Sequence, residues 1–220
     1  MVVIYINLEE KIYKLIASKL EGEYWDFKQE WHKENEKLLV DILSFANTVH
    51  EHDCYLIIGI SDDGEVVGVG EEGRKRQADV LDLLSNTIFA GDNVPDVRVN
   101  TFNIQEKEID VLTVLNSFNT PFYLKSKSAK YQKIREGYIY TRIGDKNTPI
   151  SQNASYQQIE LLWRKRLGLT RPPLLQIQDR LKNKLEWSQN ENTYYNIYRP
   201  EFKLVEENID DEWEDRRRSD

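Results

Sequence analysis

The chain has little of several features that define common protein classes. Its 220 residues include one cysteine, Cys54, so no intrachain disulfide can form, and we expect a reducing, cytoplasmic location. No apolar run approaches the ~18 residues of a membrane span. Residues 1–7 lack the basic start and long apolar stretch of a signal peptide. The phosphate-loop pattern G-x-x-x-x-G-K-[ST] does not occur, which disfavours an ATP-binding protein.

The net charge of -8 is distributed unevenly. Residues 201–220 carry -5 of it, and we expect residues 206–220 to form a disordered acidic tail. Basic residues remain in the body, and a local patch decides phosphate contact more than the total charge does. Solvated loops and helix faces are the alternative interpretation of these residues. The candidates for nucleic-acid contact are Arg74, Lys75, Arg76, Lys125, Lys127, Lys130 and Arg142.

The periodicity predicts an α+β fold with a mixed, mostly antiparallel sheet packed with helices. Apolar spacing indicates helices from Leu8 to about Leu20 and from Leu38 to Val49. Alternation predicts a strand around Trp25, and the apolar run from Tyr55 to Ile60 is typical of a central strand. The glycines and turn residues that follow this run predict a hairpin whose second strand covers residues 65–69.

The prolines of Thr170-Arg-Pro-Pro173 predict a domain boundary. We expect a core domain over residues 1–168 and a small appendage of helix and strand over residues 169–205. The acidic tail would follow as residues 206–220.

Carboxylates stand where predicted elements begin and end. Glu21 follows the first helix, Asp26 lies on the strand around Trp25, and Asp62 follows the central strand. If the two strands are neighbours, these acids lie at one edge of the sheet. Crowded carboxylates repel one another, and a divalent ion with a preference for oxygen ligands, Mg²⁺ or Mn²⁺, offsets that repulsion. The pattern therefore predicts a metal site with Glu21, Asp26 and Asp62 as ligands.

Alternatives to this site remain open. Asp63 competes with Asp62 for the ligand role, and Glu23 competes with Asp26. All of these acids also suit helix ends, strand surfaces and turns. Lys28 shares the face of Asp26, where its amine would stabilise charge that develops in a transition state. A surface salt bridge of little energetic value is the other interpretation of Lys28.

Four motifs in order resemble the Schlafen core, an Alba-like nucleic-acid-binding domain of many bacterial proteins. They are L-E-G-E-Y-W-D-F-K at 20–28, S-F-A-N-T at 44–48, L-I-I-G-I-S-D-D-G-E-V-V-G-V at 56–69 and Y-I-Y-T-R-I-G-D-K-N-T-P at 138–149. The resemblance covers about residues 8–168. Aspartate at position 26 replaces a more usual glutamate, and residues 49–54 replace the family's Gly-Gly pair with a longer polar loop.

The resemblance implies an activity. Some animal Schlafens cleave transfer and ribosomal RNA with a divalent metal and three carboxylates, two of them five residues apart, as Glu21 and Asp26 are here. It therefore implies a metal-dependent endoribonuclease for structured, tRNA-like RNA, with Glu21, Asp26, Lys28 and Asp62 as catalytic residues. The alternative is a non-catalytic nucleic-acid-binding or transcription-regulatory module. Animal Schlafens carry two such cores, so we expect this single-core chain to form a homodimer.

Overall fold

The structure is a computed structural model, and it describes residues 7–127, 129, 131–190 and 193–205. The chain divides into two compact units, residues 1–169 and 170–220. The expected acidic tail, residues 206–220, lies outside the described residues. None of the helices described here is long and apolar enough to cross a bilayer.

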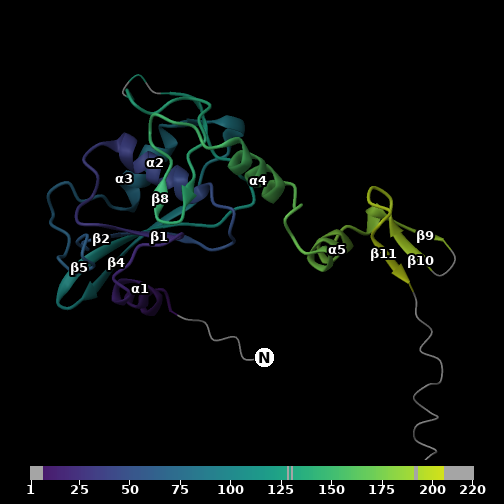
Figure 1. Cartoon of the computed structure of the whole chain (residues 1–220), viewed down its shortest axis with the longest axis horizontal. Helices are drawn as coiled ribbons and strands as arrows, with labels where there is room; N and C mark the ends of the chain where they lie inside the picture. Colours follow the sequence, from purple (N-terminus) through teal and green to yellow (C-terminus); the bar gives the residue numbers. More distant parts are fainter. Residues whose placement is uncertain (1–6, 128, 130, 191–192, 206–220) are drawn as a thin grey trace, which may run out of the picture. The chain divides into compact units, whose positions relative to one another are not determined.

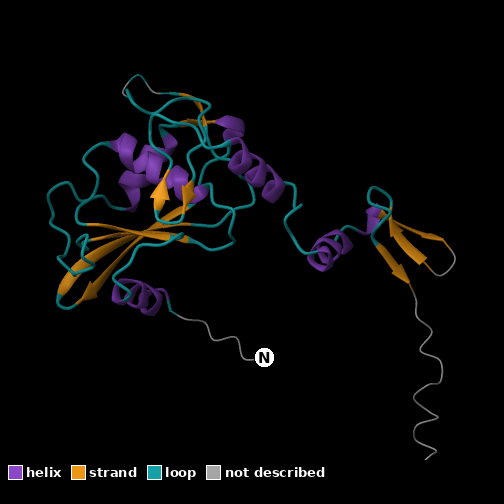
Figure 2. Cartoon of the chain, viewed as in Figure 1, coloured by secondary structure: helices purple, strands orange, loops and turns teal. Residues whose placement is uncertain are grey.

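The first unit is built on a four-stranded sheet in the order β1-β2-β5-β4. Strand β1 pairs in parallel with β2, and the other two pairings are antiparallel. Helix α1 covers one face of the sheet, and α2 and α3 cover the other (Figures 1 and 2). The α+β class with a mixed, mostly antiparallel sheet is thus confirmed. The bounds are α1 Leu8–Ala17, β1 Trp25–Lys28, α2 Asn35–Ala46, β2 Cys54–Ile58, α3 Gln77–Ser85, β4 Val97–Ile104 and β5 Lys107–Val114.

Alternation along β1 decides which face each of its side chains meets. Phe27 is buried in the apolar cluster that includes Ile12 and Ile16 of α1. Because neighbours on a strand point to opposite faces, Asp26 and Lys28 lie on the side of α2 and α3. Two charged side chains of β1 are thereby directed toward the helices that form the larger core.

The predicted hairpin after β2 takes a different form. Residues 65–69 do not form a strand, and a single bridge joins Ile60 to Val66. The backbone N–H groups of Val67 and Gly68 both donate to the carbonyl oxygen of Gly59, at 2.8 and 2.9 Å. Gly59 has φ of +100°, a conformation that favours glycine, so the chain folds tightly there instead of extending.

The predicted helix ends also shift. Helix α1 ends at Ala17, and Lys19, with φ of +54°, turns the chain before Leu20. Helix α2 begins and ends three residues earlier than predicted, at Asn35 and Ala46.

Shorter elements complete the first unit. Ser155 caps α4 by accepting a hydrogen bond from the backbone N–H of Gln158. The bounds are β3 Ile88–Phe89, η1 Ala90–Asp92, β6 Leu124–Ser126, β7 Arg142–Ile143, β8 Lys146–Asn147 and α4 Tyr156–Arg166.

The second unit contains a helix and an antiparallel three-stranded sheet in the order β11-β10-β9. Leu181, Trp187, Tyr194 and Leu204 line a mostly apolar hollow in it. The bounds are α5 Pro173–Leu181, η2 Lys184–Glu186, β9 Trp187–Asn190, β10 Thr193–Asn196 and β11 Lys203–Val205.

Lys165 of α4 is a buried lysine, only 1% exposed. Its amine donates to the carbonyl oxygens of Thr48 and His50 at 2.9 and 2.7 Å and to Asn116 Oδ1 at 2.7 Å. Burial lowers the pKa of this amine to about 8. Nearby, burial raises the pKa of the Cys54 thiol to about 12. The two groups therefore act on stability in opposite directions at alkaline pH.

Stability should rise between pH 8 and 9. Over that range the folded chain loses the Lys165 proton while the unfolded chain keeps it, so the free energy of unfolding increases by up to about 1.4 kcal/mol per pH unit. Above pH 9 the unfolded thiol of Cys54 ionises and the folded one does not, which offsets the Lys165 contribution, so the free energy of unfolding should level off between pH 9 and 10. Urea unfolding at pH 8, 9 and 10 measures both slopes. Lys165→Met should abolish the rise, and an equal rise in that variant would contradict this assignment.

Candidate active site around Asp26

A tight turn brings Glu21 to the start of β1. The N–H of Gly22 donates to the carbonyl oxygen of Trp25 at 3.1 Å. A Cβ on Gly22 would lie 2.3 Å from the Trp25 ring, so the close packing of this turn requires glycine. Glu21 Oε1 then accepts a hydrogen bond from the N–H of Phe27 at 2.9 Å. Partial burial, together with the charge of Asp26, raises the pKa of Glu21.

Asp26 is a buried carboxylate, 4% exposed, held by two cations. Oδ1 accepts from Arg142 Nη2 at 3.0 Å, and Oδ2 accepts from the amine of Lys28. The same guanidinium donates to the carbonyl oxygens of Gly22 and Trp25, at 3.0 and 3.2 Å. Arg142 therefore ties β7 to the turn and strand that carry Glu21 and Asp26.

Lys28 is the cation of this cluster that reaches solvent, with its side chain 30% exposed. Burial lowers the pKa of its amine, but the carboxylates of Asp26, Asp41 and Glu21 outweigh that effect. The net result is a raised pKa, so the amine is cationic at neutral pH. The site thus presents a fixed positive charge at the surface.

A second carboxylate extends the network. Asp41 of α2 is 8% exposed, and its Oδ2 lies 2.6 Å from His32 Nε2. Asn147 donates to Asp41 Oδ1 at 2.8 Å and accepts from Arg142 Nη1 at 2.9 Å. A continuous chain of hydrogen bonds therefore runs from His32 through Asp41, Asn147, Arg142 and Asp26 to Lys28.

Glu21, Asp26 and Asp62 are not gathered into one ligand set. Strands β1 and β2 are neighbours, as the site required, but Asp62 and Asp63 are exposed in the turn beyond β2. That turn contacts the end of α1, where Lys19 pairs with Glu65. In the part of the chain that the structure describes, no group of three His, Cys, Asp or Glu side chains is arranged to hold a metal.

The side chains that surround Asp26 also do not suit the binding of a divalent ion. Each of its oxygens already accepts a hydrogen bond from a cationic side chain, Lys28 or Arg142. A metal ligand needs lone pairs that point into an open site, and a dication would be repelled by two cations so close. The residues present therefore do not form the expected three-carboxylate centre.

Two arginines expected to contact nucleic acid have structural roles instead. The Arg142 side chain is 1% exposed, and its donors are used inside the protein. The Arg74 side chain is 9% exposed and binds Asp110 through Nε and Nη2, at 2.9 and 2.8 Å. Arg74 also pairs with Glu71 and Glu108. A guanidinium buried among carboxylates is not available to a phosphate, so both assignments are corrected.

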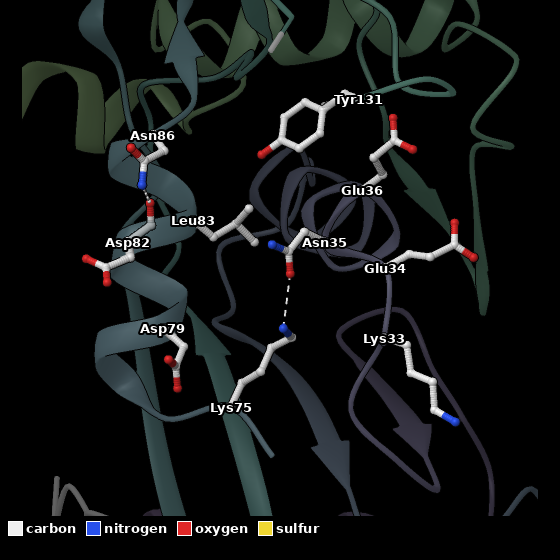
Figure 3. A pocket seen from close by; sticks show the side chains of 10 residues that line it. All are labelled: Lys33, Glu34, Asn35, Glu36, Lys75, Asp79, Asp82, Leu83, Asn86 and Tyr131. Carbon is white, nitrogen blue, oxygen red and sulfur yellow. Dashed lines mark hydrogen bonds between the residues drawn. The ribbon is translucent and has the colours of Figure 1, made fainter. Parts of the chain in front are cut away.

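Lys75 lies in acidic surroundings. Its amine donates to Asn35 Oδ1 at 3.0 Å across a pocket of about 660 Å³ between α2 and α3 (Figure 3). This pocket brings together four acidic side chains and only two lysines, so it does not suit a phosphate. The acids are Glu34, Glu36, Asp79 and Asp82, and the lysines are Lys33 and Lys75.

The remaining candidates are exposed. The side chain of Arg76 is 74% exposed and lies 3.5 Å from Glu71. Lys125 and Lys127 are exposed at β6 and just after it, whereas Lys130 lies outside the described residues. The placement of Arg76, Lys125 and Lys127 leaves their charges accessible to an anion.

Lys125 and Lys127 belong to a segment with further exposed cations, which we call the basic loop (Lys125, Lys127, Lys133 and Arg135). Glu36 in the first turn of α2 anchors this segment by accepting from the N–H groups of Lys133 and Ile134, at 2.8 and 3.2 Å. Five residues separate Glu36 from Asp41, about 7.5 Å along the helix axis. The basic loop and the Asp26 network are thus attached to the same short helix.

Sequence reasoning did not identify His32, Asp41 or Asn147. The sequence contains one indication of Asp41, because this acid stands among the apolar residues of α2 and a buried acid needs a polar or charged partner. His32 and Asn147 lie in polar stretches, where nothing in the sequence distinguishes them from ordinary surface residues.

Three comparisons with known proteins show what this chain is similar to. The chain is similar to the DIP2311 protein from Corynebacterium diphtheriae, with 17% identity over 79% of this chain, 33% of that one and a TM-score of 0.46. It thus spans about a third of that protein's length. It is also similar to the N-terminal domain of a protein related to the ATP-dependent DNA helicase RecG from Nitrosomonas europaea. That likeness has 18% identity over 66% of this chain and 94% of the other, with a TM-score of 0.38.

No curated protein matches the chain. The family model of Schlafen, AlbA_2 matches residues 21–151. This range contains Glu21, the Asp26 network and the basic loop, and it covers more than half of the sequence. The chain belongs to the Schlafen, AlbA_2 family.

Proposed function

We propose that this chain is an endoribonuclease that acts on structured RNA of the transfer-RNA kind. Membership of the Schlafen, AlbA_2 family points to a function connected with nucleic acids, and the proposal goes beyond that to cleavage. The observation that supports it most is Lys28, a partly exposed cation held at one position by buried Asp26. A fixed cation of this kind stabilises the extra negative charge of a phosphorane transition state without reorganisation.

Other features support the same proposal. The basic loop supplies exposed charge for the RNA backbone, and Arg135 lies 5.5 Å over the ring of Tyr138. A cation beside an aromatic ring suits both phosphate contact and base stacking. A requirement for Mg²⁺ or Mn²⁺ stays a prediction of the family resemblance alone, since Glu21, Asp26 and Asp62 do not form the ligand set expected for it. The homodimer also stays a prediction.

A non-catalytic nucleic-acid-binding module is the second candidate. In that case the exposed cations of the basic loop would bind nucleic acid without any contribution from Lys28. The buried Asp26–Arg142 pair would then serve only to stabilise the fold. Incubating purified protein with transfer RNA separates the two, with cleavage followed on gels with Mg²⁺, with Mn²⁺ and with EDTA. Binding without cleavage in all three conditions would favour the module.

The basic loop should carry much of the RNA affinity. Replacing Lys125, Lys127 and Arg135 with alanine should weaken binding roughly tenfold at 0.1 M salt. The slope of log K against log salt should fall by about 2 to 3, since each phosphate contact contributes about 0.7 on a single strand and about 0.9 on duplex DNA. Fluorescence anisotropy at several salt concentrations measures both changes.

The matched control for this triple variant removes the same charge elsewhere. Lys14, Lys19 and Arg164 are exposed on or beside helices and pair with Glu10, Glu65 and Glu160. Their alanine triple should keep most of the affinity. Equal losses in both triples would mean that total charge, and not the loop, governs RNA binding.

A further inference from the structure

A histidine and an aspartate beside Lys28 form a pair that the three-carboxylate prediction did not include. We propose that His32, oriented by Asp41, takes the proton from a ribose 2′-hydroxyl, so that the chain cleaves RNA by transesterification without a metal ligand set. This inference rests on the proposed ribonuclease function and assigns the base for that reaction. His32 would be the catalytic residue, and Asp41 would be a positioning residue.

The contact between the two side chains defines the state of the imidazole. His32 Nε2 lies 2.6 Å from Asp41 Oδ2. A carboxylate accepts hydrogen bonds, so Nε2 carries the hydrogen and Nδ1 keeps a lone pair, a tautomer inferred from the bond. A base oriented by a buried carboxylate is the arrangement by which histidine activates hydroxyl groups in enzymes.

Asp41 is itself held in place. Asn147 donates to Oδ1 at 2.8 Å, and Asp41 is 8% exposed, so its carboxylate has little freedom to turn. The side chain of His32 is 18% exposed, which leaves it in contact with solvent. The dyad therefore has a rigid buried end and an accessible end.

The dyad and Lys28 belong to one cluster. Hydrogen bonds from Asp41 through Asn147, Arg142 and Asp26 reach the Lys28 amine, so the carboxylate that orients His32 and that amine belong to one connected network. Only four positions separate Lys28 at the end of β1 from His32. A phosphodiester beside the Lys28 amine would thus have a cation and a base on the same local surface.

The chemical step balances without a metal. The 2′-hydroxyl proton moves to Nδ1 of His32 as the 2′-oxygen attacks phosphorus, forming the P–O2′ bond. The P–O5′ bond breaks, and the departing 5′-oxygen takes a proton from solvent water while the imidazolium returns its proton to solvent. The products are a 2′,3′-cyclic phosphate and a 5′-hydroxyl. Lys28 stabilises the phosphorane charge in this step.

The test uses the whole 220-residue chain and transfer RNA. In EDTA the wild type should still cleave, leave 2′,3′-cyclic phosphate ends, and fail on an oligonucleotide with a 2′-deoxyribose at the cut site. His32→Gln keeps a donor for Asp41 but cannot accept the proton, so its kcat should fall at least 100-fold with RNA affinity unchanged. Asp41→Asn should lower kcat with KM unchanged. His52→Gln, the same change at an exposed histidine, should cleave like wild type.

Rescue of activity by added imidazole would distinguish a catalytic role of His32 from a purely structural one. His32→Ala should regain part of its activity when imidazole is added, since free imidazole can act as the base. If His32→Gln does not fold, the end-group analysis and the EDTA arm on wild type still decide the question.

Several outcomes would overturn the inference and leave the proposed function standing. These are cleavage only with Mg²⁺ or Mn²⁺, products with 5′-phosphate ends, cleavage of the 2′-deoxy substrate, and wild-type activity in folded His32→Gln. If the wild type cleaves RNA under none of these conditions, the proposed function falls as well.

Discussion

Replacing Arg142 with methionine is expected to lower the free energy of unfolding of the first unit by about 3 to 5 kcal/mol. Methionine fills a similar volume, but it leaves the buried carboxylate of Asp26 with Lys28 as its remaining partner. It also removes the donors that hold the carbonyl oxygens of Gly22 and Trp25 and the amide oxygen of Asn147. Urea unfolding at neutral pH measures the loss.

Two further variants define the cause. Lys146→Met, at an exposed position of β8, should change the free energy of unfolding by less than about 0.5 kcal/mol. The double variant Asp26→Leu/Arg142→Met removes both charges and should lose less than the sum of the single variants. A folded Arg142→Met of wild-type stability with weakened RNA binding would instead restore Arg142 as a phosphate contact.

Replacing Lys28 with methionine is expected to lower RNA cleavage roughly 100-fold, about 2.7 kcal/mol of transition-state stabilisation. The change keeps an apolar stem of similar length and removes only the charge. Because the charge acts chiefly on the phosphorane, kcat should fall more than RNA affinity does. Single-turnover cleavage of transfer RNA and anisotropy with a nuclease-resistant RNA measure the two quantities.

Lys19→Met is the control, an exposed lysine paired with Glu65 on another part of the same unit. It should cleave RNA like wild type. Asp62→Asn tests the three-carboxylate prediction directly, since a comparable 100-fold loss there would make Asp62 part of the reaction. Unchanged cleavage in Lys28→Met, with binding intact, would remove the main support for the proposed function.

The local patterns in the sequence were sufficient for the class of the fold and for several of its main helices and strands, although not for the hairpin predicted at residues 65–69. Apolar spacing located α1, α2 and β2, since periodicity records which side chains each element buries. The motifs from residue 20 to 149 identified the family, and the alternation at Trp25–Lys28 placed Asp26 and Lys28 on one face. Glu21, Asp26 and Lys28 do lie together in the structure.

The partners of these side chains were decided by the tertiary structure. Arg142 follows Asp26 by 116 residues, and Asn147 follows Asp41 by 106, so no local period connects them. The basic character of Arg74 and Arg142 suggested phosphate contact, but whether a charge faces solvent or a buried carboxylate depends on long-range packing. The turn after β2 shows the same limit. Its acids match a ligand pattern, but the fold places them against the end of α1, because the tight bend at Gly59 directs the chain there.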